Sequence, residues 1–108
     1  MTRTSVIIFA AACCSGAIAA YAAETVQISQ QGVKFSTKEL SASPGTVVVF
    51  HNDDATTHNI TVQNPGGKQE NSGSQKPGED FSVNLTEAGT YDVHCLIHPK
   101  MKMTIDVK

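Results

Sequence analysis

The sequence has no tryptophan, only three cysteines and no clear excess of one sign of charge. Eight lysines and arginines stand against ten aspartates and glutamates, so the clustered basic surface typical of nucleic-acid-binding proteins is missing. The chain also lacks paired carboxylates, a nucleophile–base combination and a glycine-rich phosphate loop. We therefore expect a protein that is not an enzyme and does not bind nucleic acid. Its 108 residues, 40% of them hydrophobic, suffice for one small globular domain without repeats.

The N-terminus has the pattern of an export signal. Its three parts follow in the usual order, namely a positive charge at Arg3, an apolar stretch at Val6–Ala12 and a small-x-small cleavage motif at Ala20–Ala22. We expect residues 1–22 to be a cleaved signal peptide, with the bond after Ala23 as the alternative cut. The apolar run is short for a membrane span of about 20 residues. An uncleaved anchor and a lipoprotein are the weaker alternatives, so we expect no stable membrane insertion after cleavage.

Cleavage would leave residues 23–108 as a single exported domain with a low content of sulfur. Removing 22 of the 108 residues leaves 86, takes away Cys13 and Cys14, and changes the net charge from −2 to −3 because Arg3 is the only arginine. Exported domains of this size usually carry paired disulfides. The remaining thiol, Cys95, must therefore be buried, paired with another chain or bound to something. A bound metal would also stabilise so small a core.

Short strand patterns recur along this domain, whereas no twelve-residue window has a convincing helical period. The predicted strands are Val26–Ser29, Val33–Phe35, Thr46–Phe50, Asn59–Gln63, Phe81–Leu85, Thr90–His94 and Met103–Val107. This pattern predicts an all-β domain, either a sandwich or a barrel. The polar run between Asn64 and Asp80 has no cysteine, histidine or aromatic residue. It is interpreted as a mobile surface connection. Asp53–Asp54 and Glu79–Asp80 are interpreted as solvated turns.

Soft metal ligands are concentrated near the C-terminus. Cys95, His98, Met101 and Met103 all lie in one strand–loop–strand segment, and Cys-x-x-His lets two ligands converge on one ion. Sulfur combined with imidazole favours copper or zinc over hard cations, and two histidines, a cysteine and a distant methionine form the blue-copper arrangement. The second histidine must come from upstream.

Of the upstream histidines, His58 is the better placed ligand because it begins a strand at one end of the predicted sandwich. His51 lies within or at the end of the Thr46–Phe50 strand, a poorer place from which to converge. Strand alternation puts Cys95 on the same face as Tyr91 and Val93, and His94 on the other face. We therefore expect His94 to be structural or exposed to solvent.

The order of these motifs resembles the cupredoxin family. The motifs are Val48–Asp53, His58-Asn59-Ile60, Glu87–Cys95 and the following Leu-Ile-His-Pro-Lys-Met. Within the family the segment Thr86–Met101 is most similar to amicyanin, and more distantly to plastocyanin and pseudoazurin. The resemblance covers nearly all of the mature chain and implies a cupredoxin-like Greek-key β-sandwich of about seven or eight strands.

The resemblance also implies the copper ligands. It assigns His58, Cys95 and His98 as equatorial ligands of one ion that cycles between Cu(I) and Cu(II), and Asn59 as a residue that braces the ligand loop near the sulfur. Met101 is the expected axial ligand, because Val107 follows it by six positions, as in the amicyanin and plastocyanin pattern. Met103 is the alternative.

One departure lies between Cys95 and His98. Many relatives have Ser/Thr-Pro there, whereas this chain has Leu96-Ile97. The sequence therefore does not define the hydrogen bonds of this loop. The same pair adds apolar surface beside His98.

The functional expectation is a periplasmic mononuclear type 1 (blue) copper protein that acts as a soluble one-electron carrier. We expect a monomer that interacts transiently with redox proteins. The amicyanin likeness suggests a dehydrogenase as electron donor and a c-type cytochrome as acceptor. His98 would be the port for the electron, within a contact patch formed by Leu96, Ile97, Pro99 and Lys100. A copper-binding carrier or storage protein without redox shuttling is the alternative, and a structural zinc site is a weaker third hypothesis.

Overall fold

The computed structural model describes residues 24–108, which form eight strands and no helix. The strands are β1 (Thr25–Gln30), β2 (Glu39–Ala42), β3 (Thr46–Asn52), β4 (Ile60–Gln63), β5 (Gln69–Asn71), β6 (Asp80–Leu85), β7 (Gly89–Cys95) and β8 (Lys102–Val107). The predicted signal peptide, residues 1–22, lies outside the described residues. Within residues 24–108 there is no helix long and apolar enough to span a membrane.

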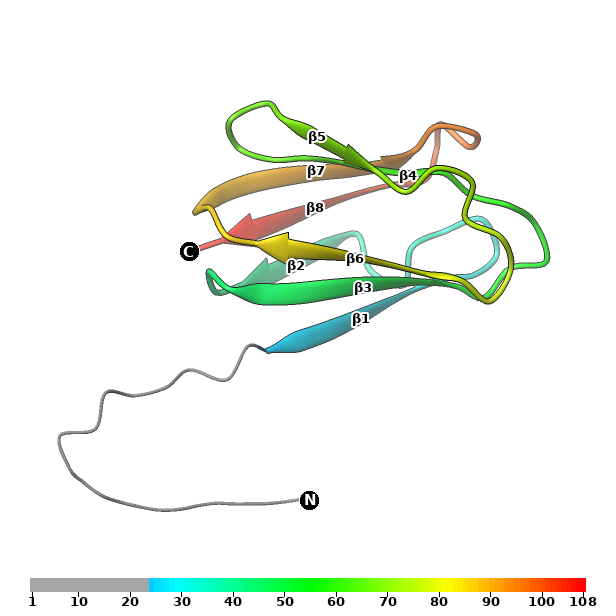
Figure 1. The fold of residues 1–108 in the computed structure, drawn as a ribbon, viewed down its shortest axis with the longest axis horizontal. Helices are drawn as coiled ribbons and strands as arrows, with labels where there is room; N and C mark the ends of the chain where they lie inside the picture. The colour runs from blue at the N-terminus through cyan, green and yellow to red at the C-terminus, as the bar shows by residue number, and fades with distance from the viewer. Residues whose placement is uncertain (1–23) are drawn as a thin grey trace, which may run out of the picture.

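The strands form two sheets that face each other (Figure 1). One sheet has the order β1-β3-β6, and the other has the order β2-β8-β7-β4-β5. The pairs β1–β3 and β2–β8 are parallel, and all other strand pairs are antiparallel. Only the β4–β5 and β7–β8 connections stay within one sheet. The expected Greek-key β-sandwich of seven or eight strands is therefore confirmed.

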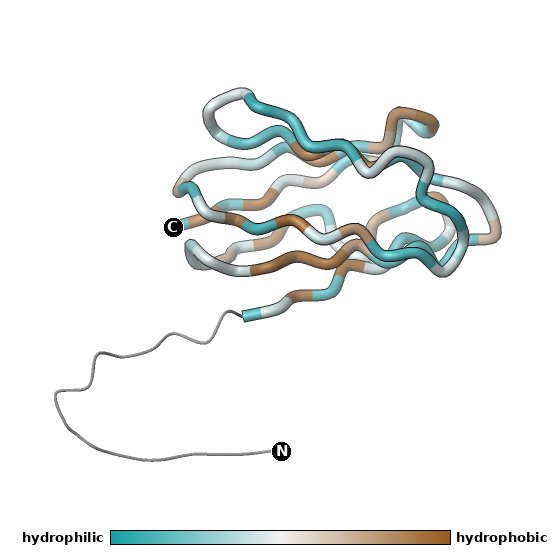
Figure 2. Tube along the Cα trace, in the orientation of Figure 1, coloured by the Kyte–Doolittle hydropathy of each residue, from teal (hydrophilic) through white to brown (hydrophobic). Residues whose placement is uncertain are grey.

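The core lies between the sheets, and burial along the strands follows a two-residue period. Along β3, the side chains of Thr46, Val48, Phe50 and Asn52 are buried while those between them are half-buried. Strand β8 alternates strictly between exposed and buried residues. Figure 2 shows hydrophobic and hydrophilic positions alternating along β6 and β8, whereas β3 is hydrophobic over most of its length. Because apolar side chains leave water only on one face of each strand, this pattern drives the sheets together.

The predicted strand at Val33–Phe35 is wrong. Gly32 and Val33 both have positive φ angles, of 67° and 57°, and occupy the middle of a tight turn closed by a hydrogen bond from Gln31 N to Lys34 O. Phe35 makes only an isolated bridge to Gln30. The next strand is β2, which pairs with β8 and which the sequence analysis missed. Valine is a residue type typical of strands, but the turn places the backbone of Val33 in the left-handed region.

The polar run from Asn64 to Asp80 is more ordered than a surface connection. It contains strand β5, which pairs with β4, and the buried Gln75, which is 2% exposed. The backbone of Gln75 exchanges two hydrogen bonds with His58, at 2.7 and 2.9 Å. The interpretation of this run as a mobile connection is therefore wrong, because part of it is hydrogen-bonded into the sandwich.

Candidate metal centre

Three predicted ligands meet at one end of the sandwich, where β4 begins and β7 ends. Ile60 pairs with Cys95 across these strands, so His58, two residues before Ile60, lies beside the end of β7. The β7–β8 loop turns back through hydrogen bonds from Met101 N to His98 O and from Cys95 N to Met101 O, at 2.9 and 3.1 Å. His58, Cys95 and His98 consequently form a cluster of potential metal ligands.

The distances within this cluster fit one metal ion. The two Nδ1 atoms of His58 and His98 are 3.1 Å apart, and Cys95 Sγ lies 3.7 and 3.6 Å from them. Atoms bonded to one ion at about 2.0–2.3 Å have separations in this range. His58 and Cys95 are fully buried, while His98 is half-buried. One thiol and two imidazoles in a dry site match a soft ion such as copper and do not match calcium or magnesium.

The side chain of Asp54 determines which nitrogen of His58 is available to a metal. Asp54 Oδ2 lies 2.8 Å from His58 Nε2, and only a protonated Nε2 donates to this carboxylate. Nδ1 is then left with a free lone pair directed into the cluster. Burial alone raises the pKa of Asp54, but hydrogen bonds from His58, Val33 N and Gly32 N outweigh burial and hold that pKa below its ordinary value.

Asn59 braces the ligand loop as expected, although it does so through its backbone. Its N–H points to Cys95 Sγ at 3.3 Å, and its carbonyl oxygen accepts from Leu96 N at 2.9 Å. The Asn59 side chain turns instead to strand β5, where its Oδ1 accepts from Asn71 Nδ2 at 2.5 Å. The apolar side chain of Leu96 therefore does not deprive Asn59 of a partner, because the side-chain amide of Asn59 has its partner in Asn71.

The remaining histidines lie outside the cluster, as the sequence analysis expected. His51 is partly exposed and bonds through Nδ1 to Asp80 at 2.5 Å, with Asp53 3.3 Å from Nε2. The hydrogen bond to Asp80 raises the pKa of His51 and outweighs the opposite effect of its partial burial. His94 occupies the face of β7 opposite Cys95, as the alternating burial of that strand shows.

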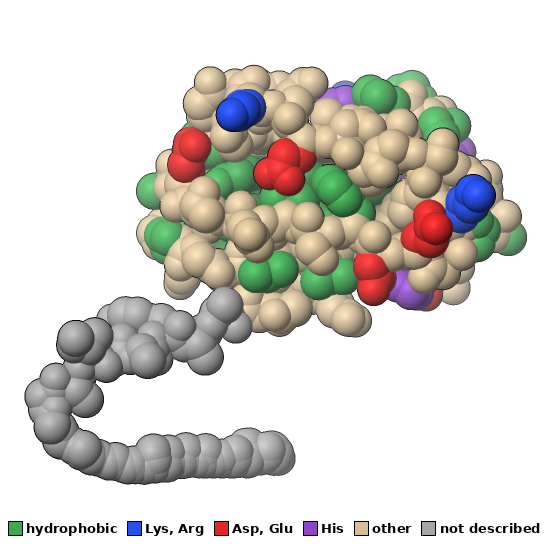
Figure 3. Space-filling model, in the orientation of Figure 1, with side chains coloured by type: hydrophobic (Ala, Val, Ile, Leu, Met, Phe, Trp, Pro, Cys, Tyr) green, Lys and Arg blue, Asp and Glu red, His purple; other side chains and the backbone are tan. Residues whose placement is uncertain are grey.

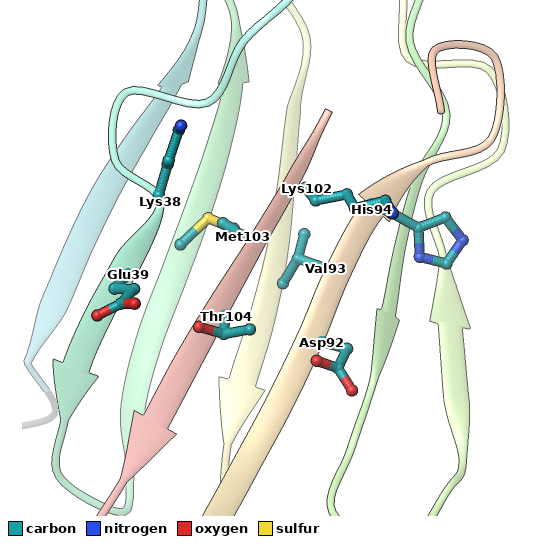
Figure 4. A pocket seen from close by; sticks show the side chains of 8 residues that line it. All are labelled: Lys38, Glu39, Asp92, Val93, His94, Lys102, Met103 and Thr104. Atoms are coloured by element: carbon teal, nitrogen blue, oxygen red, sulfur yellow. The ribbon is translucent and has the colours of Figure 1, made fainter. Parts of the chain in front are cut away.

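Both candidate methionines are buried, with 1% of Met101 and 3% of Met103 exposed. Met101 precedes β8 and lies opposite Cys95 through its backbone hydrogen bond, whereas Met103 is two pairs further along and faces Val93. Met103 also lines a pocket of about 460 Å³ together with His94, Lys38 and Glu39 (Figure 4). In that view the Met103 side chain and the His94 ring extend in opposite directions.

Sequence reasoning missed two residues around the cluster. Asp54, interpreted as part of a solvated turn, has a side chain only 12% exposed and contacts His58. Its position four residues before a candidate ligand in the same loop was the only available signal. Gln75 carried no signal, because a glutamine in a polar run is normally exposed.

Comparison with known proteins places the chain in a family. A family model described as copper binding proteins, plastocyanin/azurin family, matches residues 22–108. Amicyanin-alpha of Methylorubrum extorquens is 32% identical over 104 residues, which cover 87% of this chain and 87% of that protein. Amicyanin of Paracoccus denitrificans is 36% identical over 78 residues, covering 70% of this chain and 60% of the relative. A chloroplastic plastocyanin of Silene latifolia is 32% identical over 105 residues, covering 85% and 64%.

Solved structures give the same result. A reduced variant of amicyanin superposes with a TM-score of 0.72 at 30% identity, covering 82% of this chain and 86% of that chain. A purple cupredoxin from Nitrosopumilus maritimus has a TM-score of 0.67 at 28% identity, covering 77% and 99%. These matches confirm the resemblance to cupredoxins and the copper cofactor. Because cupredoxins are electron carriers, they also confirm the expectation that the chain is not an enzyme. The chain belongs to the plastocyanin/azurin family of copper-binding proteins.

Proposed function

We propose that this protein is a soluble periplasmic one-electron carrier whose copper ion is bound by His58, Cys95, His98 and Met101. The observation that carries the proposal is the convergence of His58 Nδ1, Cys95 Sγ and His98 Nδ1, with separations of 3.1 to 3.7 Å. A bound copper ion supplies the one-electron redox couple. The protein supplies a site that is held by backbone hydrogen bonds from strands β4 and β7 and changes little between the two oxidation states.

His98 is the proposed route for the electron, because it is the one member of the trio that is not fully buried. The loop around it exposes Leu96 and Ile97, which are 58% and 52% accessible. Figure 3 shows hydrophobic and histidine side chains gathered at this end of the molecule, and only scattered charges on the face in view. A small apolar surface beside a half-buried ligand suits brief encounters with redox partners.

The similarity to amicyanins supports a dehydrogenase as the donor and a c-type cytochrome as the acceptor. Replacing Leu96 by Asp would place a charge within the apolar contact surface without touching the buried ligands. We expect slower electron transfer to both partners in stopped-flow experiments and an unchanged copper spectrum. Equal rates for this variant and the wild type would contradict the proposed docking surface.

Loading the metal-free protein with one equivalent of Cu(II) tests the function directly. We expect an intense thiolate-to-copper band in the visible spectrum and reversible voltammetry without loss of metal, and Cys95→Ser should abolish the band. If the band is missing, the proposed site is wrong. If copper passes rapidly to a chelator while redox cycling fails, the protein is a copper carrier or storage protein, and zinc in protein from its native host would indicate a structural metal.

Met101 is proposed as the axial ligand because it lies beside Cys95 at the end of the loop. Met101→Gln should shift both the visible spectrum and the reduction potential, whereas Met103→Leu should change them little, since Met103 lies two residue pairs deeper in the sheet. The opposite result would transfer the axial role to Met103.

Export to the periplasm is proposed from the pattern of residues 1–22, and it agrees with a family match that begins at residue 22. N-terminal sequencing of protein from the periplasmic fraction should give a chain that starts at Ala23 or Glu24. A chain that retains Arg3 would contradict the proposed signal peptide.

A further inference from the structure

A single carboxylate connects the candidate metal centre to a strained turn in the other half of the chain. Asp54 lies in the β3–β4 connection, and its side chain is only 12% exposed. Oδ2 contacts His58 Nε2 at 2.8 Å and accepts from Val33 N at 3.0 Å, while Oδ1 accepts from Gly32 N at 2.6 Å. The Asp54 backbone is held in turn by Asn52 Oδ1, which accepts from Asp54 N at 2.9 Å.

The turn that contacts Asp54 is in an unfavourable conformation. Its two central residues, Gly32 and Val33, have φ angles of 67° and 57°. Glycine tolerates this region, but valine, a β-branched residue, is an outlier there, because its side chain crowds the backbone in the left-handed conformation. In this conformation both central N–H groups point to the same carboxylate. Backbone strain that is retained next to a candidate ligand is a reason to look for a role of the group it holds.

The neighbouring carboxylate has different surroundings. Asp53 has a side chain that is 41% exposed, lies near His51 and accepts from Ser29 Oγ. It makes no contact with His58 among the hydrogen bonds of the described residues. The two adjacent aspartates therefore carry the same charge but only one of them touches the metal centre.

We propose that Asp54 is a positioning residue for the copper ion, which keeps His58 protonated at Nε2 with Nδ1 toward the metal and favours Cu(II) over Cu(I) through its negative charge. This inference rests on the proposed function, since it assigns His58 as a ligand. A carboxylate that accepts from the second nitrogen of a ligating histidine orients the ring and strengthens its donor atom. The Gly32–Val33 turn holds the carboxylate by two further hydrogen bonds, so that it cannot rotate away.

The main test compares Asp54→Asn with the matched control Asp53→Asn. Each variant removes one negative charge, and the two sites are adjacent, so long-range electrostatics are nearly the same. We expect Asp54→Asn to weaken Cu(II) binding by about 10- to 100-fold relative to Cu(I). Each factor of ten corresponds to a rise of about 59 mV in the reduction potential. Asp53→Asn should change the ratio by less than about threefold at physiological salt, because the group is exposed and screened.

A second measurement uses the metal-free wild-type protein and requires no variant to fold. Nitrogen-15 NMR of the imidazoles should show His58 as the Nε2–H tautomer with its proton protected from exchange. A His58 that exchanges freely between both tautomers would overturn the proposal, as would equal potentials for the two variants.

These outcomes separate the inference from the function. If the wild type shows the visible copper band and Asp54→Asn leaves the potential unchanged, the role of Asp54 is wrong and the electron carrier remains. If the wild type shows no such band, the proposed electron-carrier function is wrong. The role of Asp54 is then judged by NMR of the metal-free protein, where free exchange of His58 between both tautomers would overturn it.

Discussion

Gln75 provides the sharpest test of how the site-bearing end of the sandwich is stabilised. Its side chain is buried and makes three hydrogen bonds. Nε2 donates to Phe50 O at 2.9 Å and to Glu79 O at 3.0 Å, and Oε1 accepts from Gln30 Nε2 at 2.7 Å. Gln30 is itself fully buried, and its Oε1 has no partner among the described residues. Replacing Gln75 by Ala removes all three bonds and leaves both polar atoms of the Gln30 amide unpaired.

The expected cost follows from these contacts. A typical hydrogen bond contributes about 1 kcal/mol net, and a buried polar group that loses its partner costs about 1–3 kcal/mol. The two bonds to backbone carbonyls together with the newly unpaired Gln30 Nε2 predict a loss of about 3–5 kcal/mol in the free energy of unfolding. Because small domains have a total stability of about 5–15 kcal/mol, this is a large fraction.

Thermal and urea denaturation of the metal-free protein, followed by circular dichroism, would measure this loss. At about 4–8 °C per kcal/mol for a domain of this size, the melting temperature should fall by at least about 12 °C. Gln69→Ala is the matched control, because the Gln69 side chain is exposed and makes one bond, to Gln63 Oε1 at 3.2 Å. It should change stability by no more than about 0.5 kcal/mol. A loss below 1 kcal/mol for Gln75→Ala would refute the reasoning.

Two further predictions concern the turn and the surface histidine. Val33→Asn should stabilise the protein by about 1 kcal/mol in urea denaturation, because asparagine tolerates the positive φ angle and Val33 is 41% exposed. A destabilised variant would show that the valine is not strained. Because the bond to Asp80 raises the pKa of His51, the stability that this pair contributes is complete below about pH 6.5 and is lost as the pH rises through the raised value. Melting temperatures of the wild type and His51→Gln should therefore differ most near pH 5 and converge at alkaline pH, and a difference that grows with pH would contradict this.

The strands that the sequence predicted correctly have a clear local pattern. Thr46–Phe50 is rich in β-branched residues and Phe81–Leu85 alternates apolar and polar residues. These segments lie within β3 and β6, which pair with each other. The missed strands, β2 and β5, have little such pattern. Strand β5 is exposed throughout and is held by its pairing with β4, so its structure comes from a neighbour and not from its own composition.

The candidate ligands divide in the same way. Cys95 and His98 were predictable because they belong to one short loop whose spacing is written in the sequence. The choice of His58 over His51 needed the strand ends, and the register of Ile60 against Cys95 brings it to the loop. The contacts of Asp54 with the Gly32–Val33 turn arise because β1 and β3 run parallel and end together, which no local pattern reveals.

The sequence by itself determined the all-β class, the ligand loop near the C-terminus and the likeness to copper proteins, because alternation and ligand spacing are local properties of a chain. Only the tertiary structure decided which polar residues surround the site. The Asp54 carboxylate and the Gln75 amide are ordinary surface groups in the sequence. They became part of the centre because folding brings the β1–β2 turn and the segment after β5 to the end of the sandwich where β4 and β7 meet. There they satisfy polar groups that burial had removed from water.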